Sequence, residues 1–329
     1  MTHTERAQVC VVASFMYDMV ATAPRRPAPG ETLVGTGFAT FVGGKGFNQA
    51  VAAARAGART AAVGRVGEDH FATEFRDFMS AEGIDAAGVA SDAENGTGVG
   101  LPVVVEGGQN SIIIVPRANE AVTTEDVEGA RATIESADVL LLQLEIPLPA
   151  VRLAAEIARG AGTRVVLNPA PFVDVPREIL DLVDVLVPNE VELGQLVPGE
   201  PDLADAALAL RRSSGCVVVV TCGSAGVLVV DSDAAPRRLD AHRVEVVDTI
   251  GAGDAFCGNL AARLALGDDL DTAIGLANAA GALSVTRPGG APSAPTAAET
   301  ARLAAVDPVQ GGPAQVDPVQ VEPVQGGQA

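Results

Sequence analysis

The chain has 329 residues, of which 48% are hydrophobic, and 22 Lys and Arg against 42 Asp and Glu give a formal net charge of −20. A field of that sign repels polyanions, so we expect no nucleic-acid partner and no binding to a membrane. No apolar run is long enough to span a bilayer, and the polar start from Met1 to Gln8 lacks the pattern of a secretory signal. The four cysteines show no CxxC spacing, which is typical of reduced packing residues in a cytoplasmic protein.

Short, β-branched apolar runs predict buried parallel strands along most of the chain. These runs cover residues 9–13, 60–66, 139–144, 164–167, 185–187 and 217–221. Helical patterns lie between them, at 48–56, 69–82, 149–161 and 205–214, and another helix begins at Thr123 with the capping-box pattern Thr-x-x-Asp126. This alternation predicts an α/β fold with a doubly wound, mostly parallel central sheet flanked by helices.

Two segments break the alternation. Residues 15–42 are rich in Pro and Gly, and residues 97–117 contain a hairpin pattern with the turn Gly107-Gly108. Neither fits a crossover helix, so we predict that together they form a small projecting β-sheet lid over a site. Residues 1–306 would then form one domain that includes the lid. The tail 307–329 repeats Pro-Val-Gln among Gly and Gln, and we predict that it is disordered.

The sharpest chemical signal is Asp248-Thr-Ile-Gly-Ala-Gly-Asp254. A strand predicted over 243–247 precedes it, and a helix predicted over about 252–267 follows. Free backbone N–H groups at that helix start would attract an anion, namely those of Gly251, Ala252 and Gly253. Asp254 could simply stabilise the helix N-terminus. The Gly-Ala-Gly context and the upstream Asp248 favour a base that accepts a hydroxyl proton beside a phosphate.

A second glycine-rich segment is Gly43-Gly44-Lys45-Gly46-Phe47-Asn48-Gln49. It is not a Walker A loop, because it lacks GxxxxGK[ST]. Its glycines would let the backbone close on a small polar ligand whose hydroxyls Asn48 and Lys45 could reach. A plain structural turn is equally compatible with the pattern.

Two further segments follow buried strands, at the edge where open α/β sheets bind ligands. Asn189-Glu190-Val191-Glu192 could hold a Mg²⁺-bound water or a phosphate, or could simply cap a helix. Thr221-Cys222-Gly223-Ser224-Ala225-Gly226 is not a GxSxG elbow and is compatible with a β-turn. The three histidines lack ligand spacing, and no GxGxxG opens the first βα turn, which argues against a dinucleotide site.

Taken together, these segments resemble the ribokinase-like carbohydrate kinase family, over about residues 9–295. Two segments, 43–50 and 248–254, look like the two signatures of that family. Four shorter ones are similar in order and spacing: Gln143-Leu144-Glu145, Asn168-Pro169-Ala170-Pro171, Pro188-Asn189-Glu190-Val191-Glu192 and Thr286-Arg287-Pro288-Gly289. Each is short, but the ordered set is specific.

The resemblance implies roles for individual residues. Asp254 would be the base, beside an anion hole formed by Gly251, Ala252 and Gly253. The residues expected to hold the sugar are Asp18, Gly43, Gly44, Lys45, Asn48 and Glu145. The residues expected to line the ATP site are Asn189, Thr221, Gly223, Ser224, Gly226, Gly253 and Asn278.

The resemblance also implies metal ions and a partner. Glu192 would bind Mg²⁺ indirectly. A K⁺ site that activates the enzyme would be formed by Asp248, Ile250, Ser284, Arg287, Gly289 and Ser293. Two lids would join to form a homodimer.

The implied activity is MgATP-dependent phosphorylation of D-ribose at its 5-hydroxyl. Three alternatives are related sugar kinases, namely a fructokinase, a deoxyribokinase or a 2-keto-3-deoxygluconate kinase. A nucleoside kinase is disfavoured because one tyrosine and no tryptophan offer little stacking surface. A non-catalytic sugar-sensing protein is disfavoured because a sensor has no need of the base in Gly-Ala-Gly-Asp.

Overall fold

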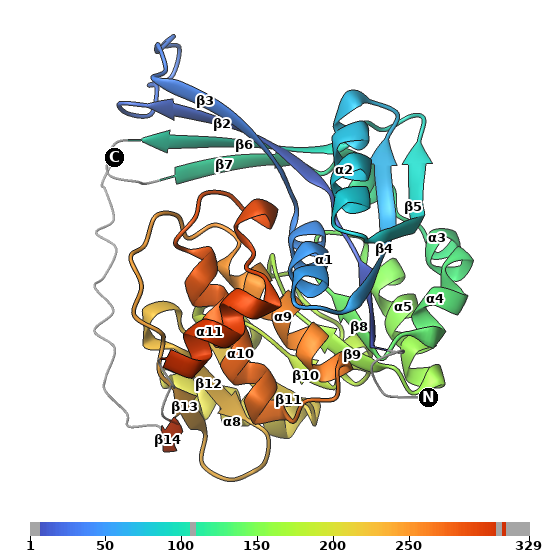
Figure 1. Ribbon diagram of the computed structural model, residues 1–329, viewed down its shortest axis with the longest axis vertical. Coiled ribbons are helices and arrows are strands. Elements are labelled where there is room, and N and C mark those ends of the chain that lie inside the picture. Colours follow the sequence, from blue (N-terminus) through green and yellow to red (C-terminus); the bar gives the residue numbers. More distant parts are fainter. Residues whose placement is uncertain (1–6, 106–109, 307–310, 314–329) are drawn as a thin grey trace.

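A computed structural model describes residues 7–105, 110–306 and 311–313. Two sheets organise this part of the chain: a large central sheet between two layers of helices, and a small sheet that projects beyond it (Figure 1). The predicted fold class is therefore confirmed. No helix in these ranges is both long and apolar enough to cross a membrane.

Seven strands of the large sheet are parallel. In spatial order they are β5 (Asp85–Asp92), β4 (Arg59–Gly67), β1 (Gln8–Val12), β8 (Val139–Leu142), β9 (Arg164–Leu167), β10 (Val185–Leu186) and β11 (Val217–Thr221). Three antiparallel strands extend the β11 edge, namely β12 (Val227–Val230), β13 (Arg237–Leu239) and β14 (Gly311–Pro313).

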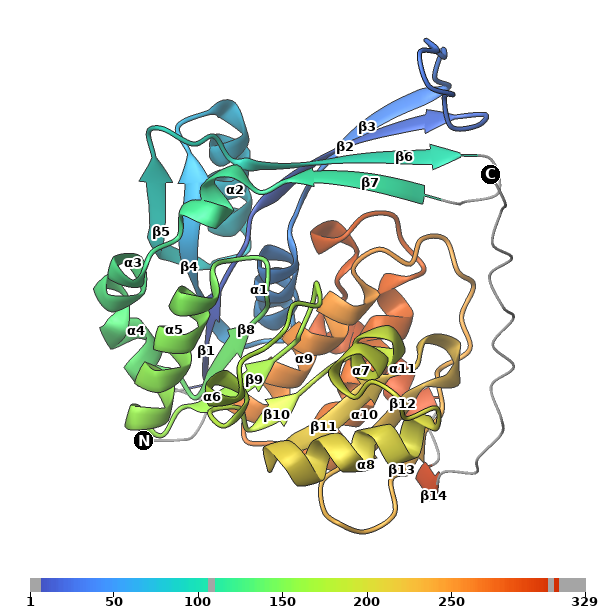
Figure 2. The same cartoon turned by 180° about the vertical axis from the view of Figure 1, so that it is seen from behind.

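Successive residues of each central strand face opposite helical layers. In β1, Val9 and Val11 join one apolar core, whereas Cys10 and Val12 join the other. The first core packs under α1 (Lys45–Arg55), α2 (His70–Ala81), α9 (Ala252–Ala265) and α10 (Leu270–Ser284), and α11 (Ala297–Val306) lies against α10. The second packs under α3 (Thr124–Gly129), α4 (Arg131–Ser136), α5 (Leu148–Ala161), α6 (Arg177–Leu180) and α8 (Leu203–Ser214), with α7 (Glu190–Leu196) beside α8 (Figure 2).

The small sheet contains β3 (Gly37–Gly43), β2 (Met16–Ala23), β6 (Gly98–Val105) and β7 (Asn110–Val115), in that spatial order. Strands β1 and β5 lead directly into β2 and β6, so the small sheet projects from the carboxyl edge of the large one. The hairpin pattern in 97–117 is confirmed by the antiparallel pairing of β6 with β7. Its turn, Gly107-Gly108, lies outside the described residues.

Two predictions need correction. The segment 243–247 is not a strand: it has no strand partner, and its Val244 and Val246 line a cleft instead of a sheet. Alternating valines therefore do not form a strand here. Within the tail predicted to be disordered, Gly311–Pro313 pairs with β13 at the sheet edge, since a free strand edge offers unpaired N–H and C=O groups. The other tail residues lie outside the described ranges.

Candidate active site

Helix α9 begins where the sequence predicted an anion-binding turn. Its N-cap, Gly251, has φ 78°, a left-handed conformation that favours glycine. A Cβ at Gly251 would lie 2.8 Å from the Cα of Gly290, so the two backbones are in close contact. A Cβ at Gly253 would meet nothing within 4 Å. The first turn of α9 is thus open to a ligand on its Gly253 side.

Asp254 lies in that first turn and is 7% exposed. Its carboxylate accepts hydrogen bonds from Asn48 Nδ2 at 2.9 Å and from Gln49 Nε2 at 3.0 Å. The two donors hold the two carboxylate oxygens in place, and both donors are neutral amides. The carboxylate therefore keeps a fixed direction and can still accept a proton.

Gln49 belongs to a longer chain of amides. Its Nε2 also donates to Asn168 Oδ1 at 3.1 Å, and its Oε1 accepts from Gln143 Nε2 at 2.6 Å. Asn168 in turn donates to Val187 O at 2.8 Å. Gln49, Gln143 and Asn168 stand in recognisable motifs, but only their contacts across the fold reveal a role for them.

Lys45 is the single lysine of the chain and lies at the start of α1. Burial alone would lower the pKa of Lys45, but the charges of Asp254, Glu145 and Glu192 outweigh burial, and the net pKa is raised. The site thus holds one ammonium group among three carboxylates. The chain as a whole has a net charge of −20 and repels anions, so an anionic ligand needs a local positive charge. The ammonium group of Lys45 supplies that charge.

The expected sugar-binding residues gather where the small sheet meets α1. Glu145 accepts from Ser14 Oγ at 2.6 Å and from the backbone N of Lys45 at 2.9 Å. Asp18 lies on β2 between two glycines of the neighbouring strands, and a Cβ at either Gly43 or Gly100 would overlap its carboxylate. Burial and the charge of Glu145 raise the pKa of Asp18 to about 6.

Asn48 offers a free acceptor in the same region. Its Nδ2 is committed to Asp254, and its Oδ1 is buried without a hydrogen-bond partner among the described residues. Burying such a group unpaired costs about 1–3 kcal/mol. A ligand hydroxyl that donates to Asn48 Oδ1 would remove that cost.

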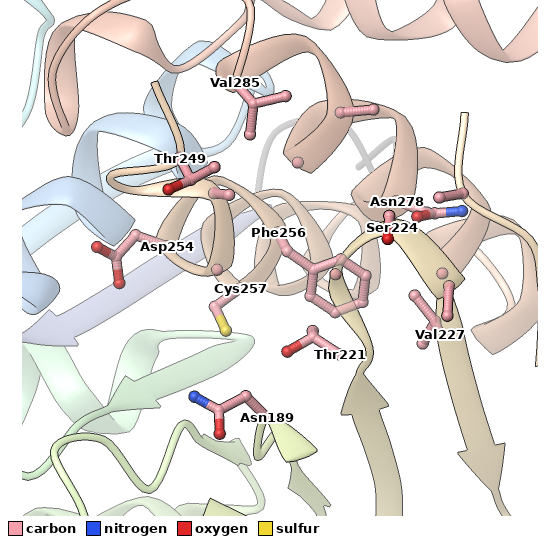
Figure 3. Close-up of a pocket in the computed structure, with 18 of the residues that line it drawn as sticks. Asn189, Thr221, Ser224, Val227, Thr249, Asp254, Phe256, Cys257, Asn278 and Val285 are labelled. Atoms are coloured by element: carbon pink, nitrogen blue, oxygen red, sulfur yellow. The ribbon is translucent and has the colours of Figure 1, made fainter. Parts of the chain in front are cut away.

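A cleft of about 1680 Å³ is lined by Asp254 and Lys45. Every residue expected to line the ATP site lines this cleft: Asn189, Thr221, Gly223, Ser224, Gly226, Gly253 and Asn278. Figure 3 shows Asp254 near one end of the cleft and Asn278 near the other, with Thr221 between them. The volume exceeds the roughly 300–1,000 Å³ typical of pockets for one small molecule, so the cleft has room for a nucleotide.

Asn189 and Glu192 form a capping box at the start of α7. Glu192 N donates to Asn189 Oδ1 at 2.8 Å, and Asn189 N donates to Glu192 Oε2 at 2.9 Å. Burial raises the pKa of Glu192, and Asp254 adds to that rise, while Asn189 and Lys45 oppose it. Both side chains therefore cap a helix, and both also line the cleft.

The residues expected to bind K⁺ come together from the loop before α9 and from the end of α10 with the segment that follows it. Asp248 accepts from Ile250 N at 3.0 Å and from Gly289 N at 2.9 Å. Arg287 N donates to Ser284 O at 3.1 Å, and Ser293 Oγ donates to Gly290 O at 2.7 Å. The donors at hand are carbonyl, carboxylate and hydroxyl oxygens, the type that hard cations prefer, so the residues fit such an ion. In the described ranges no three His, Cys, Asp or Glu side chains cluster as a metal site.

The fold and this site define a carbohydrate kinase: the family model "pfkB family carbohydrate kinase" matches residues 6–297, and the chain belongs to that family. Relatives include the ribokinase of Haemophilus influenzae, 37% identical over 90% of this chain and 97% of its own length. Bacillus subtilis ribokinase is 37% identical over 90% of this chain and 98% of its own. A structure of Arabidopsis thaliana ribokinase complexed with ribose and ATP is similar with a TM-score of 0.81 and 30% identity, covering 90% of this chain and 98% of that one.

Proposed function

We propose that the protein transfers the γ-phosphate of ATP to the 5-hydroxyl of D-ribose, giving D-ribose 5-phosphate and ADP. The observation that carries the proposal is the position of Asp254, which lines the large cleft beside Lys45 and accepts a hydrogen bond from Asn48 on α1. A buried carboxylate in that position can face an alcohol on one side and a nucleotide phosphate on the other. The ribokinase relatives supply the choice of sugar.

The reaction needs an oriented hydroxyl and neutralised charge. Asp254, held by Asn48 and Gln49, orients the sugar hydroxyl and takes its proton as the new O–P bond forms. The N–H groups of the Gly251–Gly253 turn and the ammonium of Lys45 stabilise the charge on the transferring phosphoryl group. The lid excludes water, which would otherwise compete as the nucleophile.

Other residues of the site bind the sugar or the two metal ions. Asp18, Glu145 and Asn48 accept hydrogen bonds from the sugar hydroxyls, and Gly43 and Gly44 let the backbone approach the ring. Glu192 would hold Mg²⁺ through water, and the ion would offset charge on the ATP phosphates. The loops around Asp248 would hold K⁺, and the ion would add fixed positive charge near the start of α9.

We further propose that the protein forms a homodimer through its lids. The outer strand of the lid exposes consecutive apolar side chains, since Ile112, Ile113 and Ile114 are 50%, 67% and 48% exposed. A homodimer formed through the lids would cover them. We also propose that residues 1–306 form one domain with its lid, that the protein acts in the cytoplasm, and that neither nucleic acid nor membrane is a partner.

The test is an ADP-coupled assay across D-ribose, 2-deoxyribose, fructose and 2-keto-3-deoxygluconate at one ATP concentration. We expect the highest kcat/KM with D-ribose. A higher value with 2-deoxyribose would assign the other activity seen among the relatives, as in the deoxyribokinase of Salmonella typhi, which is 34% identical over 294 residues. If none of the four sugars stimulated ADP release, these four kinase activities would be refuted and a non-catalytic sensor would be favoured.

A further inference from the structure

Arg55 lies in the last turn of α1, about 15 Å along the helix from Lys45. Its Nε and Nη2 donate to the two carboxylate oxygens of Glu82, at 3.0 and 2.6 Å. Its Nη1 points to three backbone carbonyls of one loop, those of Ala291 (3.4 Å), Pro292 (2.9 Å) and Ala294 (2.8 Å). One guanidinium group therefore joins α1, the C-cap of α2 and the loop 288–294.

The loop 288–294 contacts the residues that hold Asp254. A Cβ at Gly290 would lie 2.7 Å from Asn48 Nδ2, the atom that donates to Asp254. A Cβ at Gly251 would lie 2.8 Å from the Cα of Gly290. Gly290 thus packs against both the donor to the base and the N-cap of α9, so a shift of this loop disturbs both.

A guanidinium group suits this position better than any other side chain. It presents five donors in a rigid plane, which allows a bidentate pair with a carboxylate while one nitrogen remains for carbonyl oxygens. Arg55 and Glu82 are largely buried, with side chains 20% and 19% exposed. Ala291 O also accepts a hydrogen bond from Ala294 N at 3.3 Å, whereas Arg55 is the donor to the carbonyls of Pro292 and Ala294.

We propose that Arg55 is a positioning residue for phosphoryl transfer, which holds the loop 288–294 against Asn48 and Gly251 and so fixes the geometry of Asp254. This inference rests on the proposed function only in taking Asp254 as the reacting base. The contacts that it invokes lie within the protein and can be followed without any substrate.

The test compares Arg55→Gln with Arg159→Gln. Arg159 is a matched control, because it also lies in the last turn of a helix and pairs with a carboxylate, Asp184, at 2.6 Å, but on α5. Hydrogen exchange of the apoprotein should accelerate at least about tenfold in peptides covering 286–294 and 251–255 for Arg55→Gln only. Kinetics should be measured with whichever sugar the wild type phosphorylates. In Arg55→Gln kcat should fall about tenfold or more, because a small misplacement of Asp254 is costly. The KM values for sugar and for ATP should both stay within about twofold of the wild type.

Two further variants test the same contacts if Arg55→Gln does not fold. Glu82→Gln retains the carbonyl contacts of Arg55 but weakens its anchor, so the same peptides should exchange faster and kcat should fall by a smaller factor. Arg55→Lys should restore only part of kcat, since an ammonium group cannot make the bidentate pair. Unchanged exchange in both peptides, or equal losses in Arg55→Gln and Arg159→Gln, would overturn the inference. A wild type inactive on ribose would refute the proposed sugar and leave the exchange test standing.

Discussion

Asn48 Nδ2 donates to Asp254 Oδ2 at 2.9 Å, a contact between α1 and α9 that spans 206 positions in the sequence. Gln49, the next residue, binds the other oxygen of the same carboxylate. A carboxylate can accept about four hydrogen bonds, and the described residues use two of them. The others are available for a ligand hydroxyl, so α1 orients the base without occupying it.

Replacing Asp254 with Asn should abolish most turnover and spare binding. The carboxamide keeps the size of the side chain but cannot take the hydroxyl proton, so kcat should fall at least about 100-fold. Dissociation constants for sugar and for a non-hydrolysable ATP analogue, measured by calorimetry, should change less than about threefold. Asp268→Asn, just beyond the other end of α9, is the control and should keep wild-type kcat. Near-normal turnover in Asp254→Asn would remove Asp254 from the mechanism.

Lys45 permits a chemical test, because it is the only lysine in the chain. Lys45→Met should lower kcat/KM about 100-fold or more, as expected for loss of one charge-stabilising donor. Since the pKa of Lys45 is raised, its amine should acylate slowly at pH 8, and bound ATP with sugar should slow it further. Mass spectrometry resolves this site from the α-amino group. Acylation that ligands leave unchanged would place Lys45 outside the substrate sites.

The sequence predicted the elements whose signal is local. Strands β9 and β11 were predicted over their observed residues, because fully buried parallel strands are continuous β-branched runs. Contacts between distant residues were not predictable in this way. The bonds of Gln49 to Asp254 and of Arg55 to the loop 288–294 bridge more than 200 positions. No local pattern marks them, although both partners of the first pair stand in recognisable motifs.

Asp18 should give the sugar KM a specific pH dependence. Its pKa is raised to about 6, so a neutral carboxyl group replaces the acceptor carboxylate as pH falls through 6. The KM for sugar should therefore rise about tenfold between pH 7 and pH 5. Asp18→Asn should raise KM at pH 7 and flatten this profile. A wild-type KM that is constant from pH 7 to 5 would exclude Asp18 as a sugar ligand.

The same pKa shift predicts that Asp18 destabilises the apoprotein at neutral pH. The folded state holds the proton up to about pH 6, whereas the unfolded chain releases it near 3.8, so stability falls as pH rises through this window. Asp18→Asn should then raise the free energy of unfolding at pH 7.5 by about 1–2 kcal/mol, since the side chain is only partly buried. Urea titrations should show a smaller gain at pH 4.5. An equal gain at both pH values would contradict the assignment.

Asp248 should control the response to K⁺. Its carboxylate binds the N–H groups of Ile250 and Gly289, and in Asp248→Asn an amide NH₂ would face one of these donors. We expect the wild type to be severalfold more active in K⁺ than in tetramethylammonium. In Asp248→Asn the K⁺ concentration for half-activation should rise about tenfold, as is typical when a charged residue beside a metal site is lost. Asp231→Asn, which changes a surface partner of Arg237, serves as the control. Equal activity in both salts would argue against an activating cation site.

Arg117, directly after the lid strand β7 and Pro116, is the one non-glycine residue with positive φ among those described, at 52°. Its Nη1 donates to Thr97 O at 2.9 Å and lies 3.9 Å from Asp69 Oδ2, which ties the bases of β6 and β7 to the start of α2. The left-handed backbone costs about 1–2 kcal/mol, and the guanidinium contacts offset that cost. Arg117 thus has a strained backbone, and its guanidinium contacts hold the base of the lid in place.

Two substitutions separate these effects. Arg117→Ala removes the guanidinium and keeps the strain, whereas Arg117→Gly removes both, so the Gly variant should be about 1 kcal/mol more stable than the Ala variant by urea denaturation. Because both variants lose the guanidinium contacts with Thr97 and Asp69, both should raise the KM for sugar to a similar extent. The kcat of both variants should stay within about twofold of the wild type. If the Ala variant were the more stable one, the positive φ would not be a source of strain. If neither variant changed KM, the contact with Thr97 would have no part in positioning the lid.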